Sequence, residues 1–279
     1  RVHQLLKSKL VAFQPKFSPD GQSVAFAIGD PDKKGGSIYI LPKDKGEPRR
    51  LTNESYVWDS APSFSNDGSK VGFVRAHRYR HYSTGGMVWD DYDIYIQDVD
   101  GDSRSRLTHE KYYGAGRPSF GNNDNVLFYD ARGRYGLGRS ITTIHSIIPA
   151  DAKTPNIIIP ISSTDRNHGS FGSDPNISRD GKQITFITDR RVPFEYDVCI
   201  MKTDGSDINC LNVTRISHYN QQPTFLPDGK TILFLAGTDK NLGNRAIYSL
   251  WQVDTDGRNA EQIADSSLFT HPQRWKMER

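Results

Sequence analysis

The stretch Pro15-Lys16-Phe17-Ser18-Pro19-Asp20-Gly21 decides the fold, because its pattern returns along the chain. The pattern Pro-x-[Phe/Ile]-x-x-Asp-Gly recurs at residues 62–68, 175–181 and 223–229, with a degenerate copy at 118–124 and a further start at Pro272. Successive prolines of the repeat lie 47, 56, 57, 48 and 49 residues apart. Self-similarity at a nearly fixed period indicates a chain built from one repeated supersecondary unit.

Each repeat carries the signals of four short antiparallel strands. The Asp-Gly turn joins a first strand to an alternating apolar run such as 24–26 or 71–73, as a hairpin requires. A third strand such as Ile38-Tyr39-Ile40 follows, and a fourth such as Arg106-Leu107-Thr108 closes the unit. Four short strands per unit are typical of a β-propeller blade. A β-sandwich is the main alternative, but its strands are not obliged to recur as near-identical four-stranded modules.

The repeat predicts one all-β propeller domain over residues 1–279, with blades that start near residues 15, 62, 118, 175, 223 and 272. We expect six blades, of which five are complete four-stranded modules and one is an incomplete closing blade. Residues 2–6 resemble a fourth strand and residues 272–276 a first strand, so the two chain ends can share the closing blade. The alternatives are a natural chain that continues beyond Arg279, incomplete closure, or five full blades with extra end strands.

Composition limits the classes of partner. The 279 residues include 36 basic and 33 acidic side chains, and the net charge of +3 is too small to predict a nucleic-acid surface. A run of about eighteen apolar residues is absent, so we expect no membrane span. The sequence begins at Arg1 rather than Met, which suggests a removed signal peptide or a piece of a longer chain. Composition leaves the oligomeric state open.

Two sets of repeat residues resemble a known family. Phe17-Ser18-Pro19-Asp20-Gly21 followed by 38–40, and residues 98–101 followed by 106–108, look like the repeat of the TolB-like propellers. The resemblance runs from about Pro15 to Trp275. It implies a six-bladed propeller, periplasmic or otherwise extracytoplasmic in a bacterium, that acts through protein contacts at the ends of its channel. Similar repeats also occur as accessory propellers of larger peptidases, so the motif specifies the fold more sharply than the function.

The loops predict which face carries a site. In a propeller, the loops between second and third strands emerge on the same face as the connectors between blades, which we call the long-loop face. The opposite face carries the short Asp-Gly turns, whose residues are explained by turn chemistry. Binding usually resides in long, irregular loops on a rigid scaffold. The longest clear insertion, residues 74–93, is rich in arginine and aromatic side chains, which suits a contact surface, although it can also pack on itself.

The residues that precede each repeat proline should ring one mouth of the channel; they are Gln14, Ala61, Arg117, Asp174, Gln222 and His271. A polar ring with aromatic connectors nearby can hold a peptide or a sugar, and a hydrated channel mouth is the alternative. From the insertion, the connectors and the ring we predict a non-catalytic surface that binds a protein or peptide. Its residues are Arg78, Tyr79, Tyr82, Trp89, Tyr112, Tyr113, Arg117, His168, His218, Tyr219, Gln222 and His271.

An enzymatic propeller is the alternative function. His168, His218 and His271 each lie in a connector that leads to a repeat proline, so they can meet as an acid/base or metal cluster of a hydrolase or lyase acting on a peptide or acidic sugar. Histidines in connectors are more often ordinary surface residues, and the common hydrolase and phosphate-loop motifs are missing. Asp59 and Asp174 are too few donors for a calcium site. We therefore predict no catalytic residue, metal or cofactor.

The two cysteines, Cys199 and Cys210, flank the turn at Asp204-Gly205. If that turn is a two-residue hairpin, the cysteines are direct cross-strand neighbours and can form a disulfide. A different loop type would separate them and leave a buried free thiol. A disulfide would support an oxidising compartment.

Overall fold

A computed structural model describes residues 12–30, 35–44, 46–81, 87–101, 103–133, 141–152, 154–158, 172–192, 194–237 and 247–265. Within these ranges the chain forms twenty β-strands and short 3-10 turns, with no α-helix. The turns are η1 (Asn122–Asp124), η2 (Pro149–Asp151) and η4 (Val213–Arg215). No helix in this part of the chain has the length and apolar character needed to cross a membrane.

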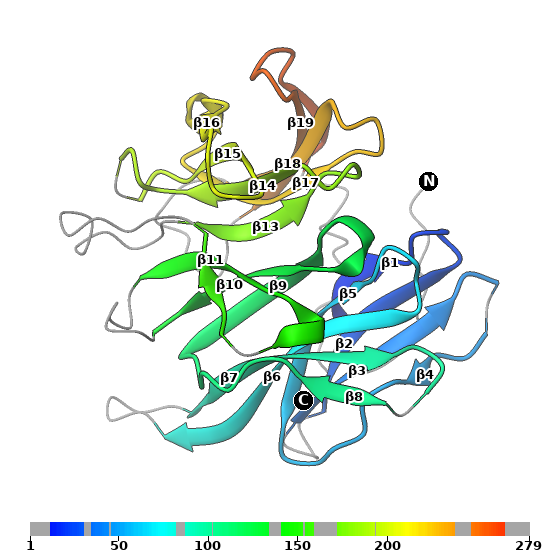
Figure 1. Cartoon of the computed structure of the whole chain (residues 1–279). Helices are drawn as coiled ribbons and strands as arrows, with labels where there is room; N and C mark the ends of the chain where they lie inside the picture. The colour runs from blue at the N-terminus through cyan, green and yellow to red at the C-terminus, as the bar shows by residue number, and fades with distance from the viewer. Residues whose placement is uncertain are drawn as a thin grey trace, which may run out of the picture.

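The strands group into five four-stranded antiparallel units, which we number blades 1 to 5 in chain order (Figure 1). Blade 1 holds β1 (Ala12–Phe17), β2 (Ser23–Asp30), β3 (Gly35–Pro42) and β4 (Arg49–Arg50); blade 2 holds β5 (Trp58–Phe64), β6 (Lys70–His81), β7 (Met87–Asp98) and β8 (Arg104–Arg106). Blade 3 holds β9 (Gly114–Phe120), β10 (Leu127–Arg132), β11 (Thr142–Ile147) and β12 (Asn156–Ile157). Blade 4 holds β13 (Ser173–Ile177), β14 (Gln183–Thr188), β15 (Asp197–Lys202) and β16 (Asn209–Cys210); blade 5 holds β17 (Tyr219–Phe225), β18 (Thr231–Gly237), β19 (Tyr248–Asp254) and β20 (Glu261–Ala264).

The first strand of each blade lies innermost. The strands β1, β5, β9, β13 and β17 contact one another in that order, from each blade to the next. Blades 1 and 2 are also joined by one parallel bridge between Gly36 and Trp58. Blades that pair within themselves and touch through their inner strands form a propeller around a channel.

Apolar seams between neighbouring blades make up the core. In β6, Val71 and Phe73 pack against blade 1, whereas Val74 packs against blade 3, because successive strand residues point to opposite faces. The aromatic residue of the repeat motif enters the seam with the preceding blade, and Phe64 and Phe120 are 9% and 5% exposed there. Each repeat therefore supplies an anchor for the blade before it.

The first repeat differs from the others at this position. Phe17 is 68% exposed, and no preceding blade is present within the described ranges. Residues 2–6 and 272–276, which the sequence assigns to a closing blade, lie outside those ranges. Five blades are thus described, and the sixth remains a prediction.

Local chemistry explains the Asp-Gly turns. Gly21 has a φ of +68°, a conformation that L side chains rarely adopt, and the Asp20 carboxylate accepts hydrogen bonds from the Ser18 hydroxyl (2.5 Å) and the Gln22 amide (2.9 Å). The bond from Ser18 is the main cause of a lowered pKa of Asp20. These side chains are occupied by the turn itself.

The connectors and the loops between second and third strands lie together on the long-loop face. The Gly36 amide donates to the Val57 carbonyl (3.0 Å), and the Tyr196 amide donates to the His218 carbonyl (2.9 Å). Tyr92 and Tyr112 form an isolated antiparallel bridge. Backbone bonds of this kind fix the position of each connector on the blades.

Cys199 on β15 and Cys210 on β16 are cross-strand partners and form a disulfide. The two cysteines are therefore direct neighbours, and the free-thiol alternative does not apply. The bridge joins the third strand of blade 4 to the short outer strand.

Candidate functional site

Every described blade has a β-bulge at the residue before the repeat proline. Gln14, Ala61, Arg117, Asp174 and Gln222 have left-handed φ angles between 45° and 57°, and strand register shifts at each of them. Proline disfavours the right-handed helical region for the residue before it, and a bulge re-aims side chains at the end of a strand. The repeat thus builds the same unusual backbone at five positions around the channel.

Hydrogen bonds connect these positions from blade to blade. The Ala61 amide donates to Oε1 of Gln14 (2.8 Å), and the Gln222 amide donates to Oδ2 of Asp174 (2.7 Å). In both cases a side chain of one blade satisfies the bulged backbone of the next. We call these five residues the pre-proline ring.

A charged cluster occupies one side of the ring. Nη1 of Arg117 forms ion pairs with Oδ1 of Asp174 and with Oδ2 of Asp130 (3.6 Å), and the Asp174 amide donates to Oδ2 of Asp130 (3.1 Å). Asp130 and Asp174 are 5% and 3% exposed. Burial raises the pKa of Asp174 to about 6, although the Arg117 guanidinium opposes this shift.

Lys16, the residue after the first repeat proline, lies close enough to this cluster for its charges to act on it. The residue is exposed, yet the surrounding protein lowers the pKa of its ammonium group, and the positive charge of Arg117 lowers it further. Asp174 acts in the opposite direction. Lys16 makes no hydrogen bond or ion pair with any residue that the structure describes.

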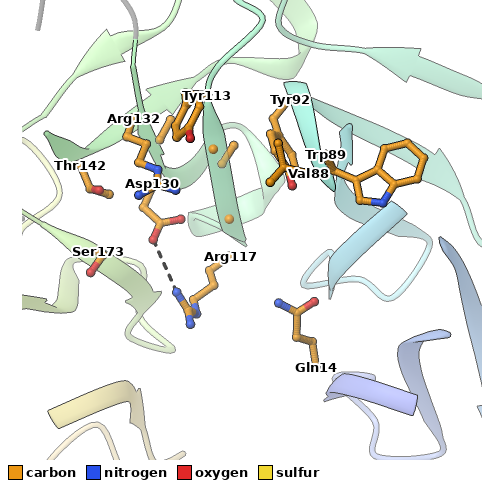
Figure 2. A pocket seen from close by; sticks show the side chains of 14 residues that line it. Gln14, Val88, Trp89, Tyr92, Tyr113, Arg117, Asp130, Arg132, Thr142 and Ser173 are labelled. Atoms are coloured by element: carbon orange, nitrogen blue, oxygen red, sulfur yellow. Dashed lines mark ion pairs between the residues drawn. The ribbon is translucent and has the colours of Figure 1, made fainter. Parts of the chain in front are cut away.

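A cavity of about 640 Å³ opens above this cluster at the mouth of the channel (Figure 2). We call it the mouth cavity. One wall is aromatic and carries Trp89, Tyr92 and Tyr113, and polar groups face it from the ring and from blade 3. Its lining consists of Gln14, Val88, Trp89, Tyr92, Tyr113, Gly114, Ala115, Gly116, Arg117, Asp130, Ala131, Arg132, Thr142 and Ser173.

Two glycines of β9 make room for the polar side chains of β10. Gly114 lies opposite Arg132 and Gly116 lies opposite Asp130 in the strand register. A Cβ atom at Gly116 would lie 2.7 Å from Oδ1 of Asp130, and one at Gly114 would lie 3.0 Å from Nε of Arg132. Glycine is therefore needed so that these side chains can lie across β9.

We expect Gly116→Ala to destabilise the protein by about 1–3 kcal/mol, because the buried Asp130 carboxylate must move away from the new methyl group. The matched variant Gly114→Ala meets only the flexible, exposed Arg132 and should cost less than about 1 kcal/mol. Urea denaturation of both variants measures the difference. Equal losses of stability would show that Asp130 is not held against β9.

A row of aromatic rings leads from the channel to the outside. The rings of Phe13 and Trp58 stack at 5.8 Å, those of Trp58 and Trp89 lie 5.8 Å apart, and those of Trp89 and Tyr79 lie 5.0 Å apart. Gly36 allows this arrangement, because a Cβ there would lie 3.0 Å from the Trp58 ring. The row joins the mouth cavity to the ends of β6 and β7 (residues 78–81 and 87–91), which we call the β6–β7 arm.

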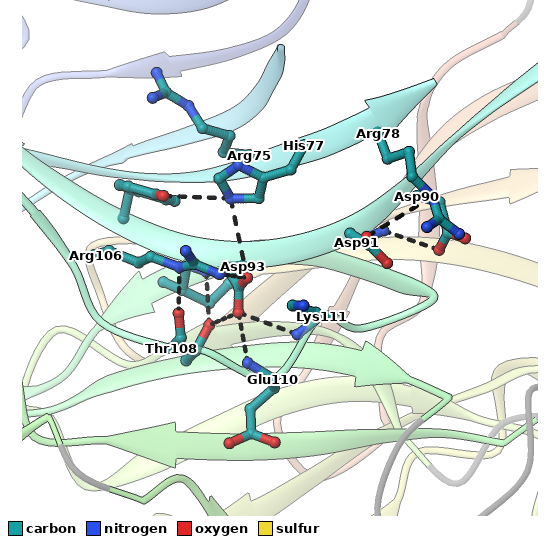
Figure 3. Close-up of polar contacts among 12 residues, drawn as sticks. Arg75, His77, Arg78, Asp90, Asp91, Asp93, Arg106, Thr108, Glu110 and Lys111 are labelled. Atoms are coloured by element: carbon teal, nitrogen blue, oxygen red, sulfur yellow. Dashed lines mark hydrogen bonds and ion pairs between the residues drawn. The ribbon is translucent and has the colours of Figure 1, made fainter. Parts of the chain in front are cut away.

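Buried polar bonds position the connector that carries Tyr113 (Figure 3). The Asp93 carboxylate, which is fully buried, accepts hydrogen bonds from the Thr108 hydroxyl (2.8 Å), the Glu110 amide (2.8 Å) and Nη2 of Arg106 (2.6 Å). His77 approaches the same carboxylate, and burial lowers the pKa of its imidazole. The connector from Thr108 onward is therefore fixed to β7 before it enters blade 3.

The structure separates the predicted contact residues into groups. Trp89, Tyr113 and Arg117 line the mouth cavity. Arg78 and Tyr79 are exposed on the β6–β7 arm, where Arg78 lies 3.8 Å from Asp91 in an ion pair (Figure 3) and Tyr79 is 43% exposed. The arm and the cavity share Trp89 through the aromatic row.

A second group lies at the junction of blades 4 and 5. Nδ1 of His218 is 3.3 Å from a carboxylate oxygen of Glu195, and the Tyr219 ring lies 6.1 Å from the Tyr196 ring. Neither His218 nor Tyr219 lines the mouth cavity. Gln222 belongs to the pre-proline ring and connects with the cluster through Asp174.

Tyr112 corrects one prediction, because it is a core residue. It is 1% exposed, its hydroxyl lies 3.0 Å from that of Tyr129, and its ring meets His145 edge-on at 5.5 Å. Neighbouring residues in extended chain point to opposite sides, so Tyr113 reaches the cavity while Tyr112 packs inward. Tyr82, His168 and His271 lie outside the described residues.

Sequence reasoning missed Lys16, Asp130 and Arg132. Lys16 directly follows a repeat proline, a position that is Ser63, Ser119, Asn176 or Thr224 in the other described repeats. The signal for Asp130 and Arg132 is the spacing Gly114-Ala115-Gly116 opposite them. Asp59 is occupied by Arg75, so it offers no free donors for calcium.

Comparison with known proteins shows which of them share this architecture. No family model matches the chain. The Tol-Pal system protein TolB of Francisella tularensis subsp. mediasiatica is 26% identical over 254 residues, which are 88% of this chain and 49% of that protein. The crystal structure of TolB from Acinetobacter baumannii matches with a TM-score of 0.70 at 19% identity, over 94% of this chain and 56% of that one. The chain therefore has the fold of the TolB-like propellers.

This TolB-like chain spans about half the length of the curated relatives it matches. The same fold occurs in enzymes. A puromycin-hydrolyzing peptidase of Mycobacterium tuberculosis matches with a TM-score of 0.62 at 15% identity, over 92% of this chain and 38% of that one. Similarity at that level shows the TolB-like fold alone, so function must be argued from the mouth cavity and its residues.

Proposed function

We propose that this TolB-like chain is a binding propeller that takes up a protein or peptide at the mouth cavity and the β6–β7 arm. The observation that carries the proposal is the cavity of about 640 Å³, with an aromatic wall beside polar side chains. Half-buried aromatic rings next to arginines are the composition of binding hot spots. A cavity that is largely pre-formed on rigid strands also reduces the entropy lost on binding.

The location that we propose is periplasmic or otherwise extracytoplasmic. The Cys199–Cys210 disulfide supports this, because disulfides persist in oxidising compartments. The curated relatives are named as proteins of the Tol-Pal system. The proposal therefore concerns a partner in the cell envelope.

Replacement of two aromatic residues tests the proposed binding site. Trp89→Ala and Tyr113→Ala together remove much of the aromatic wall and should weaken capture of a partner at least about tenfold. The assay is a pull-down from an envelope extract, with retained proteins quantified by mass spectrometry. The matched control Ile148→Ala removes an exposed apolar side chain at the turn between β11 and β12, and should capture the partner like the unmodified protein.

Melting curves must show that the double variant is folded, because Trp89 also stacks on Trp58. A folded double variant that captures the same proteins in the same amounts would place the site elsewhere. The described residues contain no group of three His, Cys, Asp or Glu arranged for a metal ion.

A further inference from the structure

We propose that the mouth cavity recognises a carboxylate of its peptide partner, held by Arg117 and Arg132. This inference rests on the proposed peptide-binding function and names the chemical group that the site selects. It follows from two arginines that line the same cavity while most of their donors make no bond with a described residue.

Some hydrogen-bond donors of Arg117 are available to a ligand. Both of its ion pairs, with Asp174 and Asp130, use the nitrogen Nη1. Its Nε and Nη2 make no bond with the described residues, and the side chain is 37% exposed at the cavity. An arginine held by one nitrogen is oriented, and its free N–H groups fit the two oxygens of a carboxylate.

Arg132 supplies the second guanidinium. Its Cζ lies 5.0 Å from the centre of the Tyr113 ring, and it has no ion-pair partner among the residues that the structure describes. Figure 2 shows Arg132 and Arg117 on either side of Asp130. Stacking on Tyr113 and the open space beside Gly114 position this side chain over the cavity.

Charge at the site favours an anion. Of the residues that line the cavity, Arg117 and Arg132 are cationic and Asp130 alone is anionic. Near them, Lys16 adds a further cation, and the buried Asp174 carboxylate is already paired with Arg117. A bound carboxylate would relieve the repulsion between Lys16 and Arg117.

The aromatic wall identifies what surrounds the carboxylate. Trp89 and Tyr92 face the cavity from β7, across from the arginines (Figure 2). An apolar side chain next to the carboxylate would pack against these rings. The site therefore fits either the C-terminus of a peptide that ends in an apolar residue or an internal Asp or Glu beside one.

Three pools of N-acetylated random octapeptides, free of Asp and Glu at their random positions, distinguish these sources. The first pool has a free C-terminal carboxylate; the second is amidated with one fixed Glu; the third is amidated with Gln in its place. The immobilised protein is exposed to all three, and retained peptides are quantified. We expect the first or the second pool to be retained about tenfold more than the third.

Arg132→Gln should abolish this preference and Lys16→Gln should weaken it, since both remove a cation that makes no hydrogen bond or ion pair with a described residue. The matched control Lys230→Gln removes one charge at the turn between β17 and β18 and should keep it. Circular dichroism melts confirm that each variant is folded. Preference for the free-acid pool identifies a C-terminus, and preference for the Glu pool identifies a side chain.

Equal retention of the three pools, lost in Trp89→Ala, would overturn the carboxylate inference and leave the peptide-binding function standing. Failure of every pool to bind would instead remove the proposed peptide function. Binding of a galacturonate trimer by protein that retains no peptide pool would assign the cations to a sugar acid and overturn both.

Discussion

The variant His145→Phe is expected to escape a loss of about 3 kcal/mol that the unmodified protein undergoes through this side chain between pH 6.5 and pH 4. His145 is 2% exposed, stacks on Tyr129 at 5.4 Å, and its Nδ1 has no hydrogen-bond partner among the described residues. Burial lowers the pKa of its imidazole to about 4. The unfolded chain binds a proton below pH 6.5 and the folded protein does not, so acid favours unfolding.

Asp174 has the opposite effect on the same pH range. Its raised pKa of about 6 means that, on acidification, the folded protein takes up a proton before the unfolded chain does. Acidification therefore raises the contribution of Asp174 to the free energy of unfolding. The pH dependence of the unmodified protein therefore combines two opposed contributions. Only the difference in stability between the variant and the unmodified protein gives the contribution of His145 alone.

Urea denaturation at several values between pH 7 and pH 4 measures this difference. His218→Phe, which replaces an exposed histidine, is the matched control and should follow the unmodified protein. NMR titration of the His145 ring reports its ionisation directly. Parallel stability profiles of His145→Phe and the unmodified protein would contradict the buried neutral imidazole.

Arg75→Met is expected to cost about 3–5 kcal/mol, because it leaves the Asp59 carboxylate buried without its counter-charge. The Arg75 side chain is 5% exposed and that of Asp59 is 1% exposed. Nε and Nη2 of Arg75 donate to the two carboxylate oxygens at 2.7 and 2.8 Å. Its guanidinium also lies 5.0 Å from the centre of the Tyr95 ring.

The double variant Asp59→Leu with Arg75→Met separates charge from packing. Replacement of a buried ion pair by apolar residues is often nearly neutral, so the double variant should recover most of the lost stability. Chemical denaturation of both variants gives the comparison. A double variant as unstable as Arg75→Met would mean that lost packing, rather than a stranded charge, causes the loss.

The repeat made the blades predictable. The Asp-Gly turns and the alternating apolar runs determine the strands through interactions between residues close in sequence. The aromatic residue of each motif contacts the neighbouring blade, as Phe64 and Phe120 do. The order of strands follows from such local signals. The pre-proline positions could also be located, because proline limits the residue before it.

The chemistry of the cavity was less predictable because it depends on side chains from different blades. Asp130 and Arg132 belong to a second strand, and they face the cavity only because Gly114 and Gly116 leave room across β9. The charges of Lys16 and Arg117, which are about a hundred residues apart in sequence, act on each other through the arrangement of blades. Similarly, no periodicity indicates which of Tyr112 and Tyr113 points inward.

The bulge before each repeat proline has a consequence for how such proteins diversify. Each module contributes one left-handed position to the lumen, while most of the apolar residues that join the modules lie elsewhere in the module. Recombination that exchanges whole modules between genes would therefore alter the lining of the pore one residue at a time. The apolar seams between neighbouring blades would be conserved. Selectivity in this architecture can then evolve in discrete steps, without a search for a new scaffold.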